Sequence, residues 1–188
     1  MRKLIAAINM TVDGVCDHTQ GIADDELHRH YNDLLRSVDT VIYGRITYQL
    51  MEYWKSVVEN PTGNSVTDEF AVTMDNIADK VVFSRTLKNV NWKNARVAKR
   101  GIEEEVLDLK SKPGKNILVG SRSLIAATME LNLIDQLQLC IHPVIAGKGL
   151  LLFESMNDKV ELKLLKTKTF DSGAIVLYYE PANTIPME

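Results

Sequence analysis

The sequence has few cysteines, and their placement argues against a metal site built on thiolates. Only Cys16 and Cys140 occur among the 188 residues, and their separation matches no metal-ligand spacing. Cys140 sits in an apolar, strand-like pattern, so we interpret it as an inert core thiol. This cysteine usage favours a reducing compartment, and we expect a cytoplasmic protein with no bound metal.

The sequence also lacks an excess of positive charge and any long apolar run. Its 22 Lys and Arg residues are outnumbered by 25 Asp and Glu residues, so we expect no nucleic-acid partner. No apolar stretch approaches the length of about 20 residues that spans a bilayer, which argues against a membrane protein. The apolar run at residues 4–8 ends at Asn9 and is too short for the signal-peptide core of about 7–15 residues.

The remaining composition, 45% hydrophobic and 25% charged, is typical of one globular domain, which we expect over residues 1–188. Periodicity predicts strands over residues 4–8, 41–43, 81–83, 117–119, 136–144, 162–170 and 174–179, with a short one near 95–98. Helices are expected over residues 24–38, after Gly44, and over 65–74, 101–110 and 121–131. A capping-box pattern at Ser65 and Asp68 opens the helix at 65–74.

The order of these elements predicts the fold class. Strand-helix-strand units pair in parallel with right-handed crossovers, whereas the closing hairpin is antiparallel. We therefore expect an α/β fold: a three-layer α/β/α arrangement with a mixed, mostly parallel sheet and a C-terminal antiparallel hairpin.

Three of the predicted strands stop abruptly at small or polar residues. These residues are Gly44, Arg45 and Thr47 after the first, Ser84 and Arg85 after the second, and Gly120, Ser121, Arg122 and Ser123 after the third. Ligands of open α/β sheets bind outside the carboxyl ends of the strands. Backbone N–H groups at helix starts and Arg side chains bind phosphate oxygens, so this edge predicts a phosphate-rich cofactor.

Each of these segments also has an interpretation without a ligand. Thr47 can cap a helix beside a surface Arg45, and Ser84-Arg85 alone is a polar turn. Ser121 can be an ordinary helix N-cap, and Lys148, between two glycines, can be a plain hairpin tip or can meet a substrate phosphate.

Seven segments in a fixed order connect the chain to a known family. They are Thr11-Val12-Asp13-Gly14, Gly44-Arg45-Ile46-Thr47-Tyr48, Tyr53-Trp54, residues 80–87, Val119-Gly120-Ser121, Leu133-Ile134-Asp135, and residues 143–149. By their order and spacing the chain resembles the dihydrofolate reductase superfamily, within it most closely the branch of the riboflavin-pathway reductase domain, the RibD C-terminal domain.

The resemblance implies an activity, a cofactor and an assembly. NADPH would be the hydride donor, its nicotinamide would face Ala6 and Ala7, and its phosphates would lie on the Gly44–Thr47 and Ser84-Arg85 segments. The diphosphate would lie at the helix start after Gly120. The family's best-known substrate is a phosphoribosylamino-pyrimidine, and members of this branch commonly form homodimers. At 188 residues we expect no attached deaminase domain.

The sequence departs from the family pattern at two places. The family's Gly-Gly step is Gly120-Ser121 here, and a serine would be strained if the step needs a glycine conformation. The carboxylate that holds the pterin in folate reductases falls near His28, although a shift of one turn would reach Asp24 or Asp25. We therefore expect dihydrofolate to be a poor substrate.

The acid–base and substrate residues are the least defined part of the site. Asp13, Asp24 and His28 are candidate catalytic groups, although Asp24 can simply favour the first helical turn and Asp13 can simply shape its turn. If the phosphates lie where we expect, the nicotinamide ends near Ala7, and Asn9, Asp13, Gly14 and Trp54 become candidate substrate-binding residues. Trp54 can equally be a core or dimer-contact residue.

Two functions follow from these patterns. The first is an NADPH-dependent reductase that transfers hydride to a C=N or C=O carbon of a small heterocyclic or carbonyl substrate. The second is a dimeric nucleotide-binding protein of the same fold without turnover, which Ser121 and the missing carboxylate favour.

Overall fold

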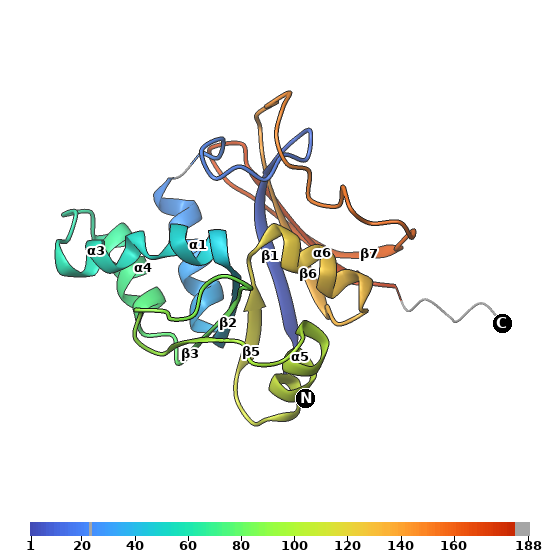
Figure 1. The fold of residues 1–188 in the computed structure, drawn as a ribbon. Coiled ribbons are helices and arrows are strands. Elements are labelled where there is room, and N and C mark those ends of the chain that lie inside the picture. Colours follow the sequence, from blue (N-terminus) through green and yellow to red (C-terminus); the bar gives the residue numbers. More distant parts are fainter. Residues whose placement is uncertain (23, 183–188) are drawn as a thin grey trace.

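The computed structural model describes residues 1–22 and 24–182, which form an eight-stranded sheet in the order β4-β3-β2-β5-β1-β6-β8-β7 (Figure 1). The strands are β1 (Leu4–Thr11), β2 (Val38–Gly44), β3 (Asp79–Phe83), β4 (Ala95–Val97), β5 (Asn116–Val119), β6 (Gln136–His142), β7 (Leu162–Thr169) and β8 (Ile175–Pro181). Neighbours from β4 to β6 pair in parallel, and β8 pairs antiparallel with both β6 and β7. The predicted mixed sheet with a C-terminal hairpin is confirmed.

Helices cover both faces of the sheet. They are α1 (Asp25–Arg36), α2 (Arg45–Met51), α3 (Tyr53–Glu59), α4 (Ser65–Asp75), α5 (Ile102–Ser111) and α6 (Arg122–Glu130). Figure 1 shows α1, α3 and α4 on one side of the sheet and α5 and α6 on the other. This is the predicted three-layer arrangement.

Two apolar cores result from the alternation of side chains along the parallel strands. On β2, Ile42 packs toward α5 and α6, whereas its neighbours Val41 and Tyr43 pack toward α1 and α4. On β1, Leu4 and Ala6 belong to the first core, and the alternate residues belong to the second. Strands buried on both faces read as continuous apolar runs, which is why the sequence identifies them.

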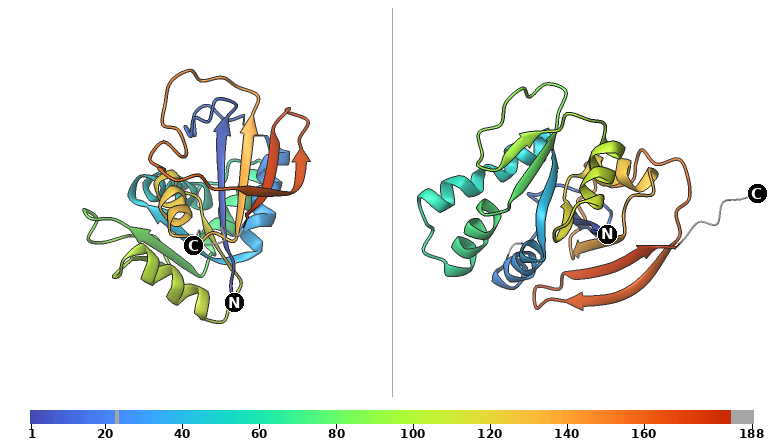
Figure 2. Two further views of the ribbon diagram at one scale, coloured as in Figure 1. Left: turned by 90° about the vertical axis from the view of Figure 1, so that its right-hand side faces the viewer. Right: turned by 90° about the horizontal axis from the view of Figure 1, so that it is seen from below.

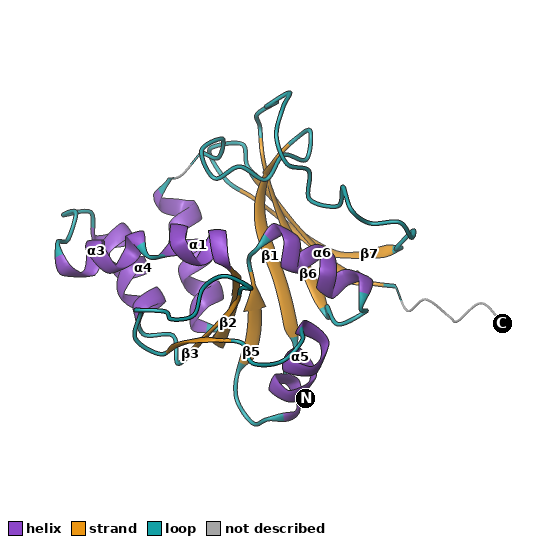
Figure 3. Ribbon diagram, in the orientation of Figure 1, coloured by secondary structure: helices purple, strands orange, loops and turns teal. Residues whose placement is uncertain are grey.

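The carboxyl ends of the parallel strands lie at one end of the sheet. Figure 2 shows the arrowheads of β1 and β6 side by side at this end, and Figure 3 shows the long loops that surround it. These loops comprise residues 12–22, which follow β1, and residues 143–161, which follow β6. Parallel pairing of β2 with β3 and β5 puts Gly44, Ser84 and Gly120 at the same edge.

The structure differs from the predicted elements in two details. The helix α3 (Tyr53–Glu59) was not predicted, because its seven residues bury only Val57 fully. The predicted capping box at Ser65 is wrong, since Asn64 is the N-cap of α4 and accepts hydrogen bonds from Val66 and Thr67. The Asp68 carboxylate instead accepts the N–H groups of Thr62 and Gly63.

The edges of the sheet bear on the expected homodimer. The apolar strand at residues 137–144 offers no free edge, because β6 pairs with β1 on one side and with β8 on the other, whereas the closing hairpin leaves one. The outer strand is β7, whose Lys163, Lys166 and Lys168 are exposed. In residues 1–22 and 24–182, no helix has the length and apolar character needed to cross a bilayer.

Candidate functional site

A hydrogen bond joins the ends of β2 and β5. The Gly44 N–H donates to Ser121 Oγ over 2.8 Å, and the Ser121 side chain is buried. Ser121 has φ −101° and ψ 125°, an extended conformation that any residue adopts. The serine in place of the family's second glycine is therefore unstrained, and its hydroxyl ties two strand ends together instead of capping α6.

The first turns of α2 and α6 lie next to each other, and neither receives a hydrogen bond from the side chain of its N-cap residue. These N-cap residues are Gly44 for α2 and Ser121 for α6. A Cβ added to Gly44 would lie 3.8 Å from both Ser121 Oγ and Ser123 Oγ, and one on Gly120 would lie 3.6 Å from the Ala7 carbonyl oxygen. Free N–H groups and hydroxyls thus converge beside the end of β1, an arrangement suited to an anion.

The predicted phosphate ligands on α2 border this edge. Arg45 is exposed, and its Nη1 donates to Gln49 Oε1 over 3.2 Å on the same helix. Thr47 is half-buried. Arg45 has no ion pair among the described residues.

The predicted ligands after β3 divide into a turn residue and an exposed cation. Ser84 Oγ accepts the backbone N–H groups of Thr86 and Leu87 over 3.2 and 2.9 Å, so it shapes a local turn. Arg85 is exposed and, in the described part of the chain, forms no ion pair. It is available to an incoming phosphate.

Arg122 binds the loop that follows β6. Its Nη1 donates to the Leu151 carbonyl oxygen over 2.8 Å and lies 4.0 Å from a Glu154 carboxylate oxygen. The structure therefore uses Arg122 to hold the loop after β6 against α6.

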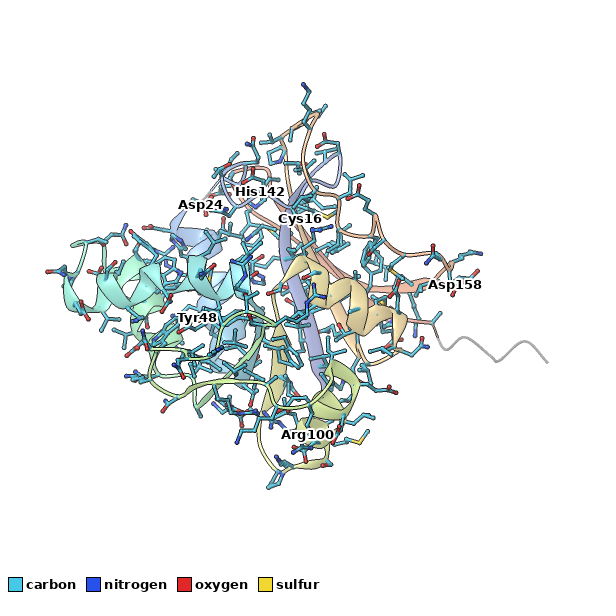
Figure 4. The ribbon with its side chains drawn as sticks, in the orientation of Figure 1. Cys16, Asp24, Tyr48, Arg100, His142 and Asp158 are labelled. Atoms are coloured by element: carbon cyan, nitrogen blue, oxygen red, sulfur yellow. The ribbon has the colours of Figure 1, made fainter. Side chains whose placement is uncertain are left out.

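Tyr48 connects α2 to the segment that carries Arg85, which sequence reasoning missed. Its hydroxyl accepts the N–H groups of Asn91 and Trp92 over 3.2 Å each and donates to Glu52 Oε1 over 3.1 Å. Burial and Glu52 raise its pKa, so the hydroxyl keeps its proton. Tyr48 is 2% exposed and is labelled left of centre in Figure 4.

The far end of the same segment packs on a buried lysine. Lys80 is fully buried, donates to the carbonyl oxygens of Asp75 and Ile77 over 3.0 Å each, and lies 4.9 Å from the centre of the Trp92 ring. Burial lowers its pKa to about 8. Trp92 Nε1 also donates to Asp75 Oδ1 over 2.7 Å, so the residue-84–94 segment is fixed to the end of α4.

Asp13 clamps two loops. Its carboxylate accepts the Thr11 hydroxyl over 2.5 Å and the N–H groups of Ala146 and Gly147 over 3.1 and 2.7 Å. These bonds lower its pKa to about 2, led by the Thr11 bond. Gly14 takes the expected positive φ of 82°. Asp13 is ionised at neutral pH, which suits a structural anion better than a proton donor.

Asn9 lies in a network of polar groups at the end of β1. Its Oδ1 is 2.9 Å from the Tyr31 hydroxyl and 3.0 Å from His142 Nε2. His142 is 1% exposed, and its Nδ1 accepts the Ile22 N–H over 3.0 Å. Gly21 packs on the imidazole, since a Cβ there would lie 3.3 Å from Nε2. The sequence analysis missed His142, although its position at the end of an apolar strand signals a buried polar group.

The remaining candidates lie along α1. Asp24 caps the helix through a 2.7 Å bond from the Leu27 N–H, which lowers its pKa, and Figure 4 shows it at the same end of the molecule as His142. The half-buried His28 ring lies 6.1 Å from Trp54 and 5.7 Å from Phe70, centre to centre, and burial lowers its pKa. Trp54 and His28 thus form an aromatic cluster between helices, while Asn9 lies on β1 and Asp13 lies in the loop that follows it.

Two hollows in the surface lie away from this edge. One of about 390 Å³ is lined by residues such as Arg36, Val72 and Lys115, and one of about 410 Å³ by residues such as Met129 and Asp158. Among the described residues, no group of three His, Cys, Asp or Glu side chains is arranged to hold a metal ion.

The fold is that of a dihydrofolate reductase-like protein. The RibD C-terminal domain family matches residues 2–176, and the chain belongs to this reductase-like family. It is 33% identical over 184 residues to the uncharacterized protein YyaP of Bacillus subtilis (strain 168), covering 95% of this chain and 94% of that one.

Two crystal structures share the fold. A Shewanella sp. PV-4 protein provisionally assigned to riboflavin biosynthesis superposes with a TM-score of 0.72 at 18% identity, covering 96% of this chain and 99% of that chain. Dihydrofolate reductase from Enterococcus faecalis, complexed with NADP(H), gives 0.64 at 12% identity, covering 96% and 97%. At these identities the likeness concerns the fold.

Proposed function

We propose that the protein is an NADPH-dependent reductase that transfers hydride to a C=N or C=O carbon of a small heterocyclic or carbonyl substrate. The observation that carries this proposal is the convergence of the open starts of α2 and α6 beside Ala7, with Ser121 Oγ bonded to Gly44. Membership of the RibD C-terminal domain family supports a reductase, and the NADP(H) complex of the E. faecalis enzyme supports the cofactor.

The residues at this edge fit such a cofactor. The first N–H groups of α6 with Ser123 would hold the diphosphate, and Arg45, Thr47 and Arg85 would hold the ribose phosphate. Ala7 and Asn9 would lie against the nicotinamide, which supplies the hydride when bound. The chain's own part in the reaction is then to orient the two reactants and exclude water.

A reductase of this kind needs a proton for its product, whereas a nucleotide-binding protein without turnover needs none. Asp13 and Asp24 both have lowered pKa values, so both are ionised at neutral pH. We propose that water delivers the proton after hydride transfer. The same two carboxylates favour the second candidate, a nucleotide-binding protein without turnover, because neither supplies an acid.

A titration followed by a screen tests the proposal. Quenching of Trp fluorescence would measure NADPH and NADH affinities, and NADPH oxidation would be followed over pyrimidine, pterin, imine and carbonyl compounds. NADPH binding with turnover supports the reductase, and binding without turnover supports the alternative. Absence of binding contradicts both.

Dihydrofolate belongs in this screen as a negative substrate. By the resemblance, the position from which folate reductases hold the pterin falls near His28, whose lowered pKa keeps it neutral at pH 7. Without a carboxylate there, we expect turnover well below the typical enzyme rate of about 10 per second. Turnover at that rate would contradict the correspondence at His28.

We further propose that the protein works in the cytoplasm. Both cysteines carry free thiols, as a reducing compartment would keep them.

A further inference from the structure

We infer that Asn9 presents its amide N–H group to the substrate and thereby selects a substrate with a hydrogen-bond acceptor beside the carbon that is reduced. This inference rests on the proposed function, because it assumes that the substrate lies beside Ala7 and Asn9. The class of acceptor it indicates is a carbonyl oxygen or an unprotonated ring nitrogen.

The first step is the tautomer of His142. The Ile22 N–H points at Nδ1 over 3.0 Å, so Nδ1 must accept and carries no proton. A neutral imidazole then carries its proton on Nε2. Burial lowers the pKa of His142 despite the opposing charge of Asp24, which keeps the ring neutral at pH 7.

The second step is the orientation of the Asn9 amide. His142 Nε2 donates over 3.0 Å, so the Asn9 atom that faces it must be the oxygen. The Tyr31 hydroxyl donates to the same oxygen over 2.9 Å. With the amide reversed, its NH₂ group would face the N–H of His142, so two donors would meet. His142 is 1% exposed, and this unmade hydrogen bond would be costly because water cannot replace it.

The third step is the chemistry that remains free. Both lone pairs of Asn9 Oδ1 are used, and Nδ2 donates to no group in the described part of the chain. Asn9 is half-buried and lies on β1 two residues after Ala7, so both side chains project from the same face of the sheet. A ligand that reaches Asn9 there meets a donor held in place from three other segments: α1, β6 and the loop at Ile22.

An isosteric variant inverts this preference. In Asn9→Asp, one carboxylate oxygen would keep the bonds from Tyr31 and His142, and the other would replace the NH₂ group with an acceptor. Two flat aromatic probes of similar size, pyridine and pyrrole, differ in the group they offer, a ring-nitrogen acceptor with no donor in the first and an N–H donor with no in-plane acceptor in the second. Their affinities for NADP⁺-loaded protein would be measured from backbone NMR shifts of residues 7–14.

The wild-type protein should bind pyridine at least tenfold more tightly than pyrrole, and Asn9→Asp should reverse the order. Asn60→Asp, at an exposed position after α3, adds the same charge and should keep the wild-type order. An unchanged order in Asn9→Asp, or no binding of either probe to the wild type, overturns the inference. If the wild-type protein does not bind NADPH at all, the proposed function is overturned instead.

A measurement on the unmutated protein covers the case in which Asn9→Asp fails to fold. The ¹⁵N shifts of the His142 ring should show a proton on Nε2 and none on Nδ1 at pH 7. A proton on Nδ1 would reverse the amide and overturn the inference, whatever the cofactor.

Discussion

At the scale of single residues, Arg85 is an exposed cation that, on the proposed function, would contact the extra phosphate of NADPH. A charge-assisted hydrogen bond to the extra phosphate is worth about 1.5–3 kcal/mol. Arg85→Ala should therefore weaken NADPH binding tenfold or more and leave NADH binding nearly unchanged, as calorimetry would show. Arg36→Ala is the control, since Arg36 ends α1 just before β2 begins and so lies at the opposite edge of the sheet. Equal losses for both cofactors would contradict the role of Arg85.

His30 makes stability depend on pH. Its ring packs on Phe170 and Tyr178, and burial, with a smaller effect from Lys168, lowers its pKa from 6.5 to about 4. The unfolded chain thus takes up a proton at a higher pH than the folded one. The stability from the neutral ring is complete above pH 6.5 and is lost as the pH falls toward 4.

Replacing His30 tests this dependence. His30→Leu keeps an apolar side chain there but removes the titrating group, so the melting temperature should fall less between pH 7 and 4.5 than in the wild type. A smaller dependence of the melting temperature on pH should remain, because the pKa values of His28 and His142 are also lowered. If the melting temperature of His30→Leu falls with pH as much as that of the wild type, His30 is not the source of the pH dependence.

At the scale of elements, Tyr48 couples α2, which carries Arg45, to the residue-84–94 segment, which carries Arg85. Tyr48→Phe should speed amide hydrogen exchange at Asn91 and Trp92 and reduce the preference for NADPH over NADH severalfold. Tyr43→Phe is the matched control, because that hydroxyl contacts only the Met74 sulfur among the described groups. The same change in both variants would make the effect one of general stability.

Local sequence patterns predicted the helices and strands better than the hydrogen bonds that join them. The buried parallel strands and most helices follow from runs and periods of apolar residues, and the helix starting at Asp24 follows from its acidic first turn. The bonds from Asn9 to His142 and from Tyr48 to Trp92 span 133 and 44 residues. Nothing in the neighbouring sequence specifies such partners, so the role of Ser121 and the orientation of Asn9 needed the folded chain.

At the scale of the whole molecule, the β7–β8 hairpin is the surface that bears on assembly. Leu164, Leu165 and Ile175 are exposed there, next to the lysines of β7. Lysines on an outer strand oppose edge-to-edge pairing, so a homodimer would associate through the face of the hairpin instead. Light scattering should give twice the 21.2 kDa mass of one chain, and Leu164→Lys should halve that value. A wild-type mass of one chain would contradict the homodimer.

The two thiols have a practical consequence for labelling. Burial raises the pKa of both Cys16 and Cys140 to about 11, so at pH 7 each is almost entirely the unreactive protonated form. An exposed cysteine introduced elsewhere would react far faster with maleimide dyes than either native one. Fluorophores for distance measurements between the loops can therefore be attached to the protein without first removing its own cysteines.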